Sequence, residues 1–186
     1  YYPFNGNAND ESGNGNNGTV NGATLATDRF GNANKAFQFN GQSYISTPEV
    51  FGVDVEGFTI SAWAKIGLEN AQSHAIFYKG SKQGEAILGQ SANKFEFSVK
   101  LSDYTWYMAR AIDTSLTNNF YHIVGRYRKG VAIELWINGT LINTTAIPNL
   151  DLITYPATSS SIGSYTRTVS LGWHRIIDDI RIYYRT

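Results

Sequence analysis

The feature of this sequence that most restricts its fold is a series of short segments in which apolar residues alternate with polar ones. From residue 95 to residue 101 every second side chain is apolar, which is typical of a strand with one buried face. Residues 58–66 show the same period and place five apolar side chains on one face, namely Phe58, Ile60, Ala62, Ala64 and Ile66. No apolar stripe with the helical period of 3.6 extends over ten residues or more, so the sequence predicts an all-β chain.

Further short strands are predicted at residues 37–39, 44–47, 74–79, 104–112, 120–128, 131–138, 160–163 and 176–184. The pairs Asn40-Gly41 and Asn138-Gly139 each separate two of these segments and are typical of two-residue hairpin turns. A short helical turn fits only in residues 49–55 or 113–117. So many short strands indicate an antiparallel sandwich or barrel. We expect one domain over residues 1–186, because 186 residues can bury a full core.

Composition excludes several classes of function. The 15 basic and 15 acidic residues form no basic stripe, so nucleic acid is not an expected partner. The absence of cysteine excludes disulfides and thiolate metal sites. The sequence contains no run of 18 apolar residues, so insertion into a membrane is not expected. Low charge with abundant Asn, Gly, Ser and Thr is typical of extracellular β-proteins, so we expect a monomeric module that is secreted or lies at a cell surface.

Six segments together resemble one family, in order and in spacing: YYPFNGNANDESGNGNNGTVNGATL, GNANKAFQFNGQSYIST, GFTISAWAK, FYHIVGRY, IELWINGTLI and IIDDIRIYYRT. The chain is similar over almost its whole length to the laminin-G-like, concanavalin A-like jelly-roll domains of the lectin/glucanase superfamily. Tyr121, Trp136 and Arg175 stand where that family often has Trp, Tyr and Gly. The resemblance implies a two-sheet antiparallel β-sandwich.

The carboxylates argue against catalysis. Hydrolysis of a glycan needs two carboxyl groups on either side of the scissile bond, and the hydrolytic members of the family place two Glu and an Asp on alternate positions of one strand. No such run occurs here, and adjacent acidic residues such as Asp178 and Asp179 should point to opposite faces of a strand. The chain also lacks a G-x-S-x-G motif, and its three histidines are scattered. We therefore expect no enzyme activity in this domain, although a larger parent protein can be a glycan-active enzyme.

A structural calcium ion is expected near the start of the chain. Residues 5–22 are almost purely turn-forming, so something must hold them in order. Calcium takes six to eight oxygen ligands, and the first and last strands of a jelly roll are usually neighbours. The resemblance implies that Asp10 and Asp178 bind this ion, with Asn16 and Asn40 as further donors. The alternative is that Asp10 and the asparagines form Asx turns only, and that Asp178 caps backbone amides.

A sugar-binding surface needs exposed aromatic rings and a few fixed polar groups. The segment 102–110 supplies two aromatic rings and a guanidinium on one strand face. The predicted ligand-binding residues are Tyr104, Trp106, Tyr107, Arg110, Trp136 and Tyr165. Trp106 has the alternative of closing one end of the sandwich with Arg110 solvated. We expect Trp63 and Trp173 to pack in the fold.

These observations favour a carbohydrate-binding module, non-catalytic, within a larger secreted protein that acts on polysaccharide. Its expected partner is a polysaccharide or other glycan, which would be acidic if Arg126 and Arg128 converge with Lys65 or Lys79. The alternative is a protein-binding adhesion or recognition domain of a cell-surface protein, which would present a broad apolar patch.

Overall fold

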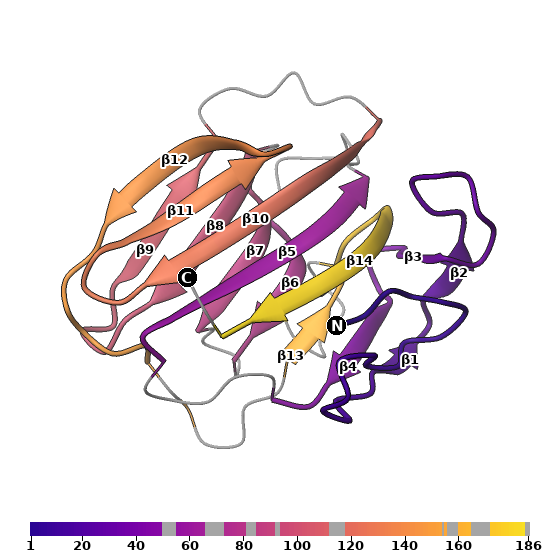
Figure 1. Cartoon of the computed structure of the whole chain (residues 1–186), viewed down its shortest axis with the longest axis horizontal. Helices are drawn as coiled ribbons and strands as arrows, with labels where there is room; N and C mark the ends of the chain where they lie inside the picture. Colours follow the sequence, from indigo (N-terminus) through magenta and orange to yellow (C-terminus); the bar gives the residue numbers. More distant parts are fainter. Residues whose placement is uncertain are drawn as a thin grey trace.

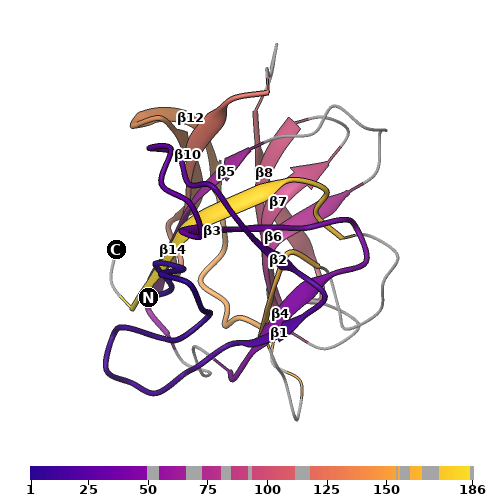
Figure 2. The same cartoon turned by 90° about the vertical axis from the view of Figure 1, so that its right-hand side faces the viewer.

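The computed structural model describes residues 1–49, 55–65, 73–80, 85–91, 94–111, 118–153, 155, 160–164 and 172–184. These residues contain no α-helix, and their strands form two sheets of seven strands with antiparallel pairing (Figure 1). Figure 2, turned by 90°, shows the two sheets as separate layers. The predicted all-β, two-sheet antiparallel sandwich is confirmed. Within the described ranges no helix is long and apolar enough to cross a membrane.

The front sheet in Figure 1 contains, in spatial order, β12 (Thr140–Ala146), β11 (Ala132–Ile137), β10 (Phe120–Arg128), β5 (Gly57–Lys65), β14 (Ile176–Tyr183), β3 (Ala36–Gln38) and β2 (Thr24–Ala26). The back sheet contains β1 (Thr19–Asn21), β4 (Tyr44–Thr47), β13 (Ser160–Ile162), β6 (His74–Lys79), β7 (Ala86–Ser91), β8 (Lys94–Lys100) and β9 (Trp106–Arg110). The main chain of Tyr2 also bridges that of Ile180, which places the start of the chain beside β14.

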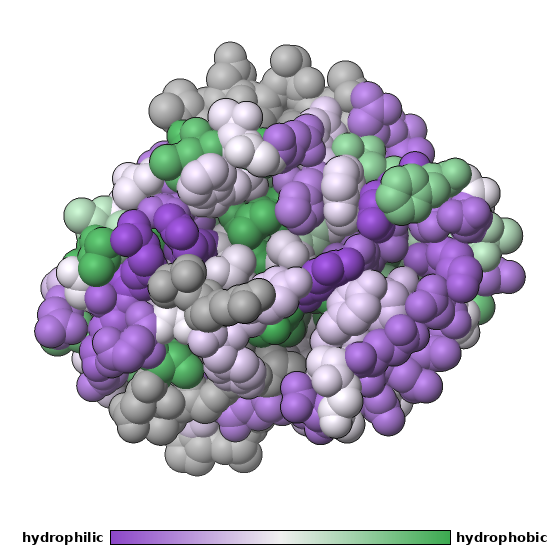
Figure 3. All heavy atoms as spheres, in the orientation of Figure 1, coloured by the Kyte–Doolittle hydropathy of each residue, from purple (hydrophilic) through white to green (hydrophobic). Residues whose placement is uncertain are grey.

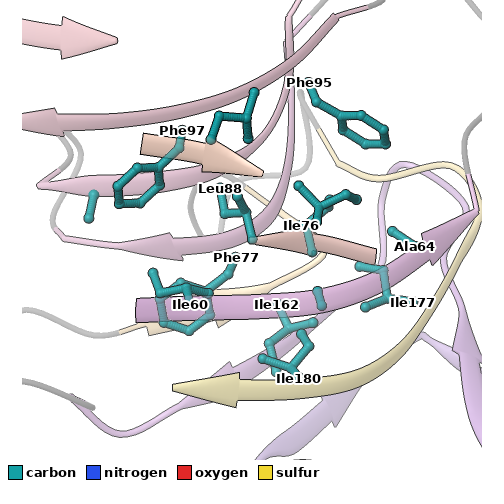
Figure 4. Packing of buried hydrophobic residues seen from close by; sticks show 14 of the residues in the cluster. Ile60, Ala64, Ile76, Phe77, Leu88, Phe95, Phe97, Ile162, Ile177 and Ile180 are labelled. Atoms are coloured by element: carbon teal, nitrogen blue, oxygen red, sulfur yellow. The ribbon is translucent and has the colours of Figure 1, made fainter. Parts of the chain in front are cut away.

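The core lies between the two sheets and follows the alternation seen in the sequence. Ile60 and Ala64 of β5 lie near Phe77, Phe97 and other fully buried side chains (Figure 4). Burial of such apolar surface stabilises the fold by about 25 cal/mol per Å². Gly125 in the core-facing row of β10 lies so close that a Cβ atom there would overlap the Phe97 ring, which explains the glycine at this position.

One of the two predicted hairpins is confirmed. Asn138 and Gly139 connect β11 to β12, with Ile137 paired to Thr140. Both turn residues have positive φ angles, of 50° and 80°, as a turn that matches the strand twist requires.

The hairpin predicted at Asn40-Gly41 is wrong. β3 pairs with β2 and β14 in the front sheet, whereas β4 pairs with β1 and β13 in the back sheet. Asn40 instead forms an Asx turn, because its Oδ1 accepts hydrogen bonds from the amides of Gln42 and Ser43 at 3.0 and 2.9 Å. The turn therefore carries the chain from one sheet to the other.

The outer edge of β9 is covered by side chains of β12. Asn143 donates a hydrogen bond to the carbonyl oxygen of Arg110, and Thr145 donates one to that of Met108, both at 2.8 Å. These two contacts close the sandwich along this edge.

Candidate functional site

The strand β9 presents a row of side chains on the outer side of the back sheet. Trp106, Met108 and Arg110 alternate with Tyr107 and Ala109, which face the core. Together with Lys100 and Tyr104, these three outward residues form a surface that we call the β9 face. Trp106 is half-buried, because it packs against a small apolar cluster of Ala75, Tyr78 and Ile87 outside the main core.

Tyr104 is held in an exposed position by the turn before β9. Its side chain is 69% exposed, and its φ angle of 63° lies in the left-handed region, which a bulky residue rarely adopts. The Tyr104 amide donates to the carbonyl of Leu101 at 2.9 Å, and the Thr105 amide donates to the Asp103 carboxylate at 2.9 Å. The ring is thus presented to solvent by a tightly hydrogen-bonded turn.

Two cations lie on the β9 face. The Lys100 ammonium is 5.7 Å from the Tyr104 ring centre and 6.0 Å from the Trp106 ring centre, so it lies near both rings. The Arg110 side chain, half exposed, pairs with the largely buried carboxylate of Glu96 on β8. This ion pair fixes the guanidinium at the other end of the row.

Three of the six predicted ligand-binding residues therefore lie on one surface, namely Tyr104, Trp106 and Arg110. Tyr107 points to the other side of the strand, where its ring packs against the core and its hydroxyl donates to Asp103 at 3.1 Å. Trp136 lies on β11, on the outer side of the front sheet, where its indole N–H donates to Glu134. Tyr165 lies outside the described residues.

The outer side of the front sheet carries a hollow, which sequence reasoning did not find. This hollow, the front groove, has a volume of about 390 Å³ and lies over β5, β10 and β14. It is lined by Arg29, Thr59, Ser61, Trp63, His122, Val124, Asp179, Arg181 and Tyr183. Figure 3 shows this side of the molecule, with apolar residues in the middle of the face among polar ones. Trp63, expected to pack in the fold, is half-buried here and stacks on His122 with ring centres 5.0 Å apart.

Arg29 links the groove to the end of the chain. Its guanidinium contacts Asp178 at 2.5 Å and Asp179 at 3.1 Å, and Arg181 holds the other side of the Asp179 carboxylate at 2.9 Å. Burial raises the pKa of Asp178, and the pairing with Arg29 lowers it only in part. No local pattern announces Arg29, because its partners lie about 150 residues later in the sequence.

The two adjacent aspartates do not point to opposite faces as a regular strand predicts. The register of β14 against β5 shifts between Asp178 and Arg181, and Asp179 has a φ angle of 49°. Such a bulge re-aims a side chain. Both carboxylates therefore reach the same guanidinium.

The predicted calcium ligands each have protein partners. The Asp10 carboxylate accepts hydrogen bonds from the main-chain nitrogens of Tyr1, Ser12 and Asn16, at 2.8, 2.9 and 3.1 Å. Burial alone would raise the pKa of Asp10, but these hydrogen bonds outweigh it and lower the pKa well below the usual range. Asp178 is paired with Arg29.

The remaining two donors are also engaged. The carbonyl oxygen of Asn16 accepts from the Tyr2 hydroxyl, and the side-chain oxygen of Asn40 closes its own turn. Among the described residues no three acidic or histidine side chains form a metal-binding group. Each of the four residues thus has a partner within the protein, and calcium binding stays a prediction to be measured.

The arginines and lysines considered for an acidic ligand do not converge. Arg126 and Arg128 both pair with Glu134, at 2.5 and 2.7 Å. Lys65 lies against the Phe120 ring, at the opposite end of β10, whereas Lys79 is buried beside Glu85 in the back sheet. The structure therefore offers no shared basic surface built from these residues.

A family model described as the concanavalin A-like lectin/glucanases superfamily matches residues 39–186. The chain belongs to this superfamily. The match covers most of the chain and includes the strands that form both the β9 face and the front groove. No curated protein matches the sequence significantly.

Solved structures of similar fold include one domain of an arabinanase and the binding domains of two toxins. One is domain 4 of AbnA, a GH43 extracellular arabinanase from Geobacillus stearothermophilus, in complex with arabinotriose. It has a TM-score of 0.74 at 23% sequence identity, and the alignment covers 98% of this chain and 89% of that domain. The binding domain of Paraclostridial mosquitocidal protein 1 has a TM-score of 0.78 at 16% identity, over 96% of this chain. The ligand-binding domain of botulinum neurotoxin serotype D, in complex with N-acetylneuraminic acid, has a TM-score of 0.76 at 16% identity, over 95% of this chain. The chain spans less than half of each toxin domain, 46% and 44%. At these identities the likeness concerns the fold.

Proposed function

We propose that this member of the superfamily is a non-catalytic glycan-binding module of a larger secreted protein that acts on polysaccharide. Its binding surface is the β9 face. Sugar rings present C–H groups that pack on aromatic faces, and their hydroxyls need fixed hydrogen-bonding partners. Tyr104 and Trp106 supply the aromatic surface, and Lys100 and Arg110 supply the donors.

The conformation of Tyr104 is the observation that carries this proposal. A left-handed φ angle at a non-glycine residue costs on the order of 1–3 kcal/mol, and such residues are enriched at functional sites. Here the strained residue exposes a large aromatic ring beside a second ring and an ammonium group. An exposed ring in this conformation contributes nothing to the core, whereas a ligand would gain a preorganised contact.

The fold comparisons support a binding role. Domain 4 of the arabinanase was solved with arabinotriose, and the botulinum domain was solved with N-acetylneuraminic acid. The arabinanase is an extracellular protein, and the botulinum domain is the ligand-binding part of a toxin. We infer the same setting for this chain.

The environment of the carboxylates supports a non-catalytic role. Glu96, Glu134 and Asp178 are each buried and paired with arginine. A general acid must reach the leaving group, and burial denies these three carboxylates that access. The ion pairs keep Glu96 and Glu134 in structural roles.

Binding of the purified domain to an array of polysaccharides and oligosaccharides tests this function. We expect binding to at least one glycan class, and about tenfold weaker binding for Tyr104→Ala, since one aromatic contact contributes about 1 kcal/mol or slightly more. Trp106→Ala should weaken binding further, with its fold checked by thermal melting because Trp106 is half-buried. Val131→Ala is the matched control, because Val131 is an exposed apolar residue between β10 and β11 that belongs neither to the β9 face nor to the front groove.

An array without any bound glycan would contradict the proposal and favour the adhesion alternative. Equal binding by wild type and Tyr104→Ala would remove the β9 face from the proposal. Against a protein-binding role, the large exposed apolar side chains of the described residues come from separate strands and turns.

A further inference from the structure

We propose that the front groove is a second glycan-binding surface, independent of the β9 face and selective for neutral sugars. This inference rests on the proposed function in one respect, namely that the domain binds glycans. It assigns a separate site to the opposite sheet. The two sites share no residue.

The groove has the shape of a small-ligand site. Ser61 and Val124 are register partners on β5 and β10, and their short side chains form its floor. The next outward pair along these strands, Trp63 and His122, is much larger and forms a wall. The resulting volume of about 390 Å³ lies within the range of about 300–1,000 Å³ that is usual for small-molecule sites.

The aromatic wall is fixed before any ligand arrives. Trp63 stacks on His122 at an interplanar angle of 26°, and the Arg29 guanidinium lies 4.9 Å from the Trp63 ring centre. Arg29 is itself held by the buried Asp178. A wall of locked side chains loses little conformational entropy when a ligand binds.

The charges of the groove match a neutral ligand rich in hydroxyl groups. Arg29 and Arg181 line it, and Asp178 and Asp179 compensate both cations. The groove therefore offers guanidinium donors beside the Asp179 carboxylate as an acceptor, and the Ser61 hydroxyl can act as both donor and acceptor. A sugar hydroxyl is likewise donor and acceptor. A uronic acid or a sulfated sugar would instead place a negative charge near the paired carboxylate of Asp179, with no uncompensated arginine to receive it.

The two surfaces face in opposite directions, because they lie on the outer sides of two stacked sheets (Figure 2). One domain would thus contact two glycan chains, or two segments of one chain. Two linked contacts raise the overall affinity for a polymer above that of either contact alone.

Amide chemical shifts of the ¹⁵N-labelled domain test the inference. The probes are arabinotriose, xylotriose and cellotriose as neutral sugars, and a trimer of galacturonic acid as the acidic one. We expect at least one neutral probe to shift the amides of Ser61, Val124 and His122, while the acidic probe leaves them unchanged. Ser61→Phe fills the floor and should weaken binding in the groove by about tenfold or more without changing the shifts on β9.

The variants separate the two sites. Arg181→Met is a second groove variant in case Ser61→Phe does not fold, since Asp179 keeps its contact with Arg29. Tyr104→Ala is the control on β9, and it should leave the groove shifts intact.

Shifts confined to β9 would overturn the second site and leave the proposed function standing. Shifts confined to the groove would support the inference and overturn the β9 face. Equal shifts from the acidic probe would overturn the selectivity, and no shift from any probe would overturn the inference.

Discussion

Replacement of Arg29 by methionine should destabilise the fold strongly, although Arg29 lies on a loop and not in the core. Methionine keeps much of the aliphatic bulk and removes the charge. In the described structure Arg29 is the only cation paired with Asp178, which is 2% exposed. Asp179 would keep Arg181. Loss of one partner of a buried ion pair costs about 3–5 kcal/mol, because the other charge stays buried without compensation.

That cost is large against a typical total stability of about 5–15 kcal/mol. For a chain of this size, 1 kcal/mol corresponds to about 2–4 °C, so the melting temperature should fall by about 6–20 °C. The assay is urea unfolding followed by tryptophan fluorescence, with calorimetry for the melting temperature. Lys129→Met is the matched control. Lys129 pairs with the exposed Glu56 and Asp151, so its loss should leave stability nearly unchanged.

The pH dependence of this loss gives an independent check. The folded-state pKa of Asp178 is raised above its ordinary value of 3.8, so the contribution of this group to stability is fully present below pH 3.8 and is lost as the pH rises from there through the folded pKa. Without Arg29 the charged form is still less favourable. The difference between wild type and Arg29→Met should therefore be largest at neutral pH and shrink as the pH falls toward the pKa of Asp178. A second substitution, Asp178→Asn, should recover much of the loss. The reasoning is refuted if Arg29→Met costs no more than Lys129→Met, or if Asp178→Asn recovers nothing.

Three further measurements follow from the structure. Gly125→Ala should cost about 1–3 kcal/mol in urea unfolding, because the added methyl group overlaps the Phe97 ring; an unchanged midpoint would contradict the packing described. Tyr104→Gly should raise stability by roughly 1 kcal/mol by relieving the left-handed φ angle while it weakens glycan binding, and lower stability would show that the turn needs the ring. The melting temperature should be higher in calcium than in chelator, and Asp10→Asn should remove that rise, because the calcium ion expected from the sequence would use the Asp10 carboxylate; equal melting temperatures would show that the protein donors of Asp10 alone order the loop.

Much of the fold was predictable because its strands carry a period-2 pattern. The alternation in residues 95–101 corresponds to β8, and that in residues 58–66 to β5. The burial of Trp173 was also predicted. The short strands β1 and β2 were not, since Thr19–Asn21 and Thr24–Ala26 are mostly exposed and owe their form to pairing with β4 and β3. Asn40-Gly41 carries the same dipeptide signal as Asn138-Gly139, but a local signal does not say in which sheet the next strand pairs.

The candidate sites were predictable only where they lie on one strand. Trp106 and Arg110 share a face because they are four residues apart on β9. The front groove combines residues from three strands and the loop around Arg29, so its composition depends on strand order and on a bulge in β14. A sequence pattern contains neither of these. The sequence likewise marks Tyr104 as an aromatic candidate for binding, but it does not reveal the left-handed φ angle of this residue, because that angle depends on the folded turn.

The side chains of Asn143 and Thr145 that cover β9 have a consequence beyond the closure of the sandwich. An edge strand normally offers a row of unpaired carbonyl groups, to which another chain can add a strand. Here the carbonyls of Met108 and Arg110 are already acceptors within the same molecule. A neighbouring copy would have to break both hydrogen bonds before it could extend the sheet. The strand that displays Trp106 and an exposed methionine is thus protected from edge-to-edge aggregation, even when many copies are concentrated along one polymer.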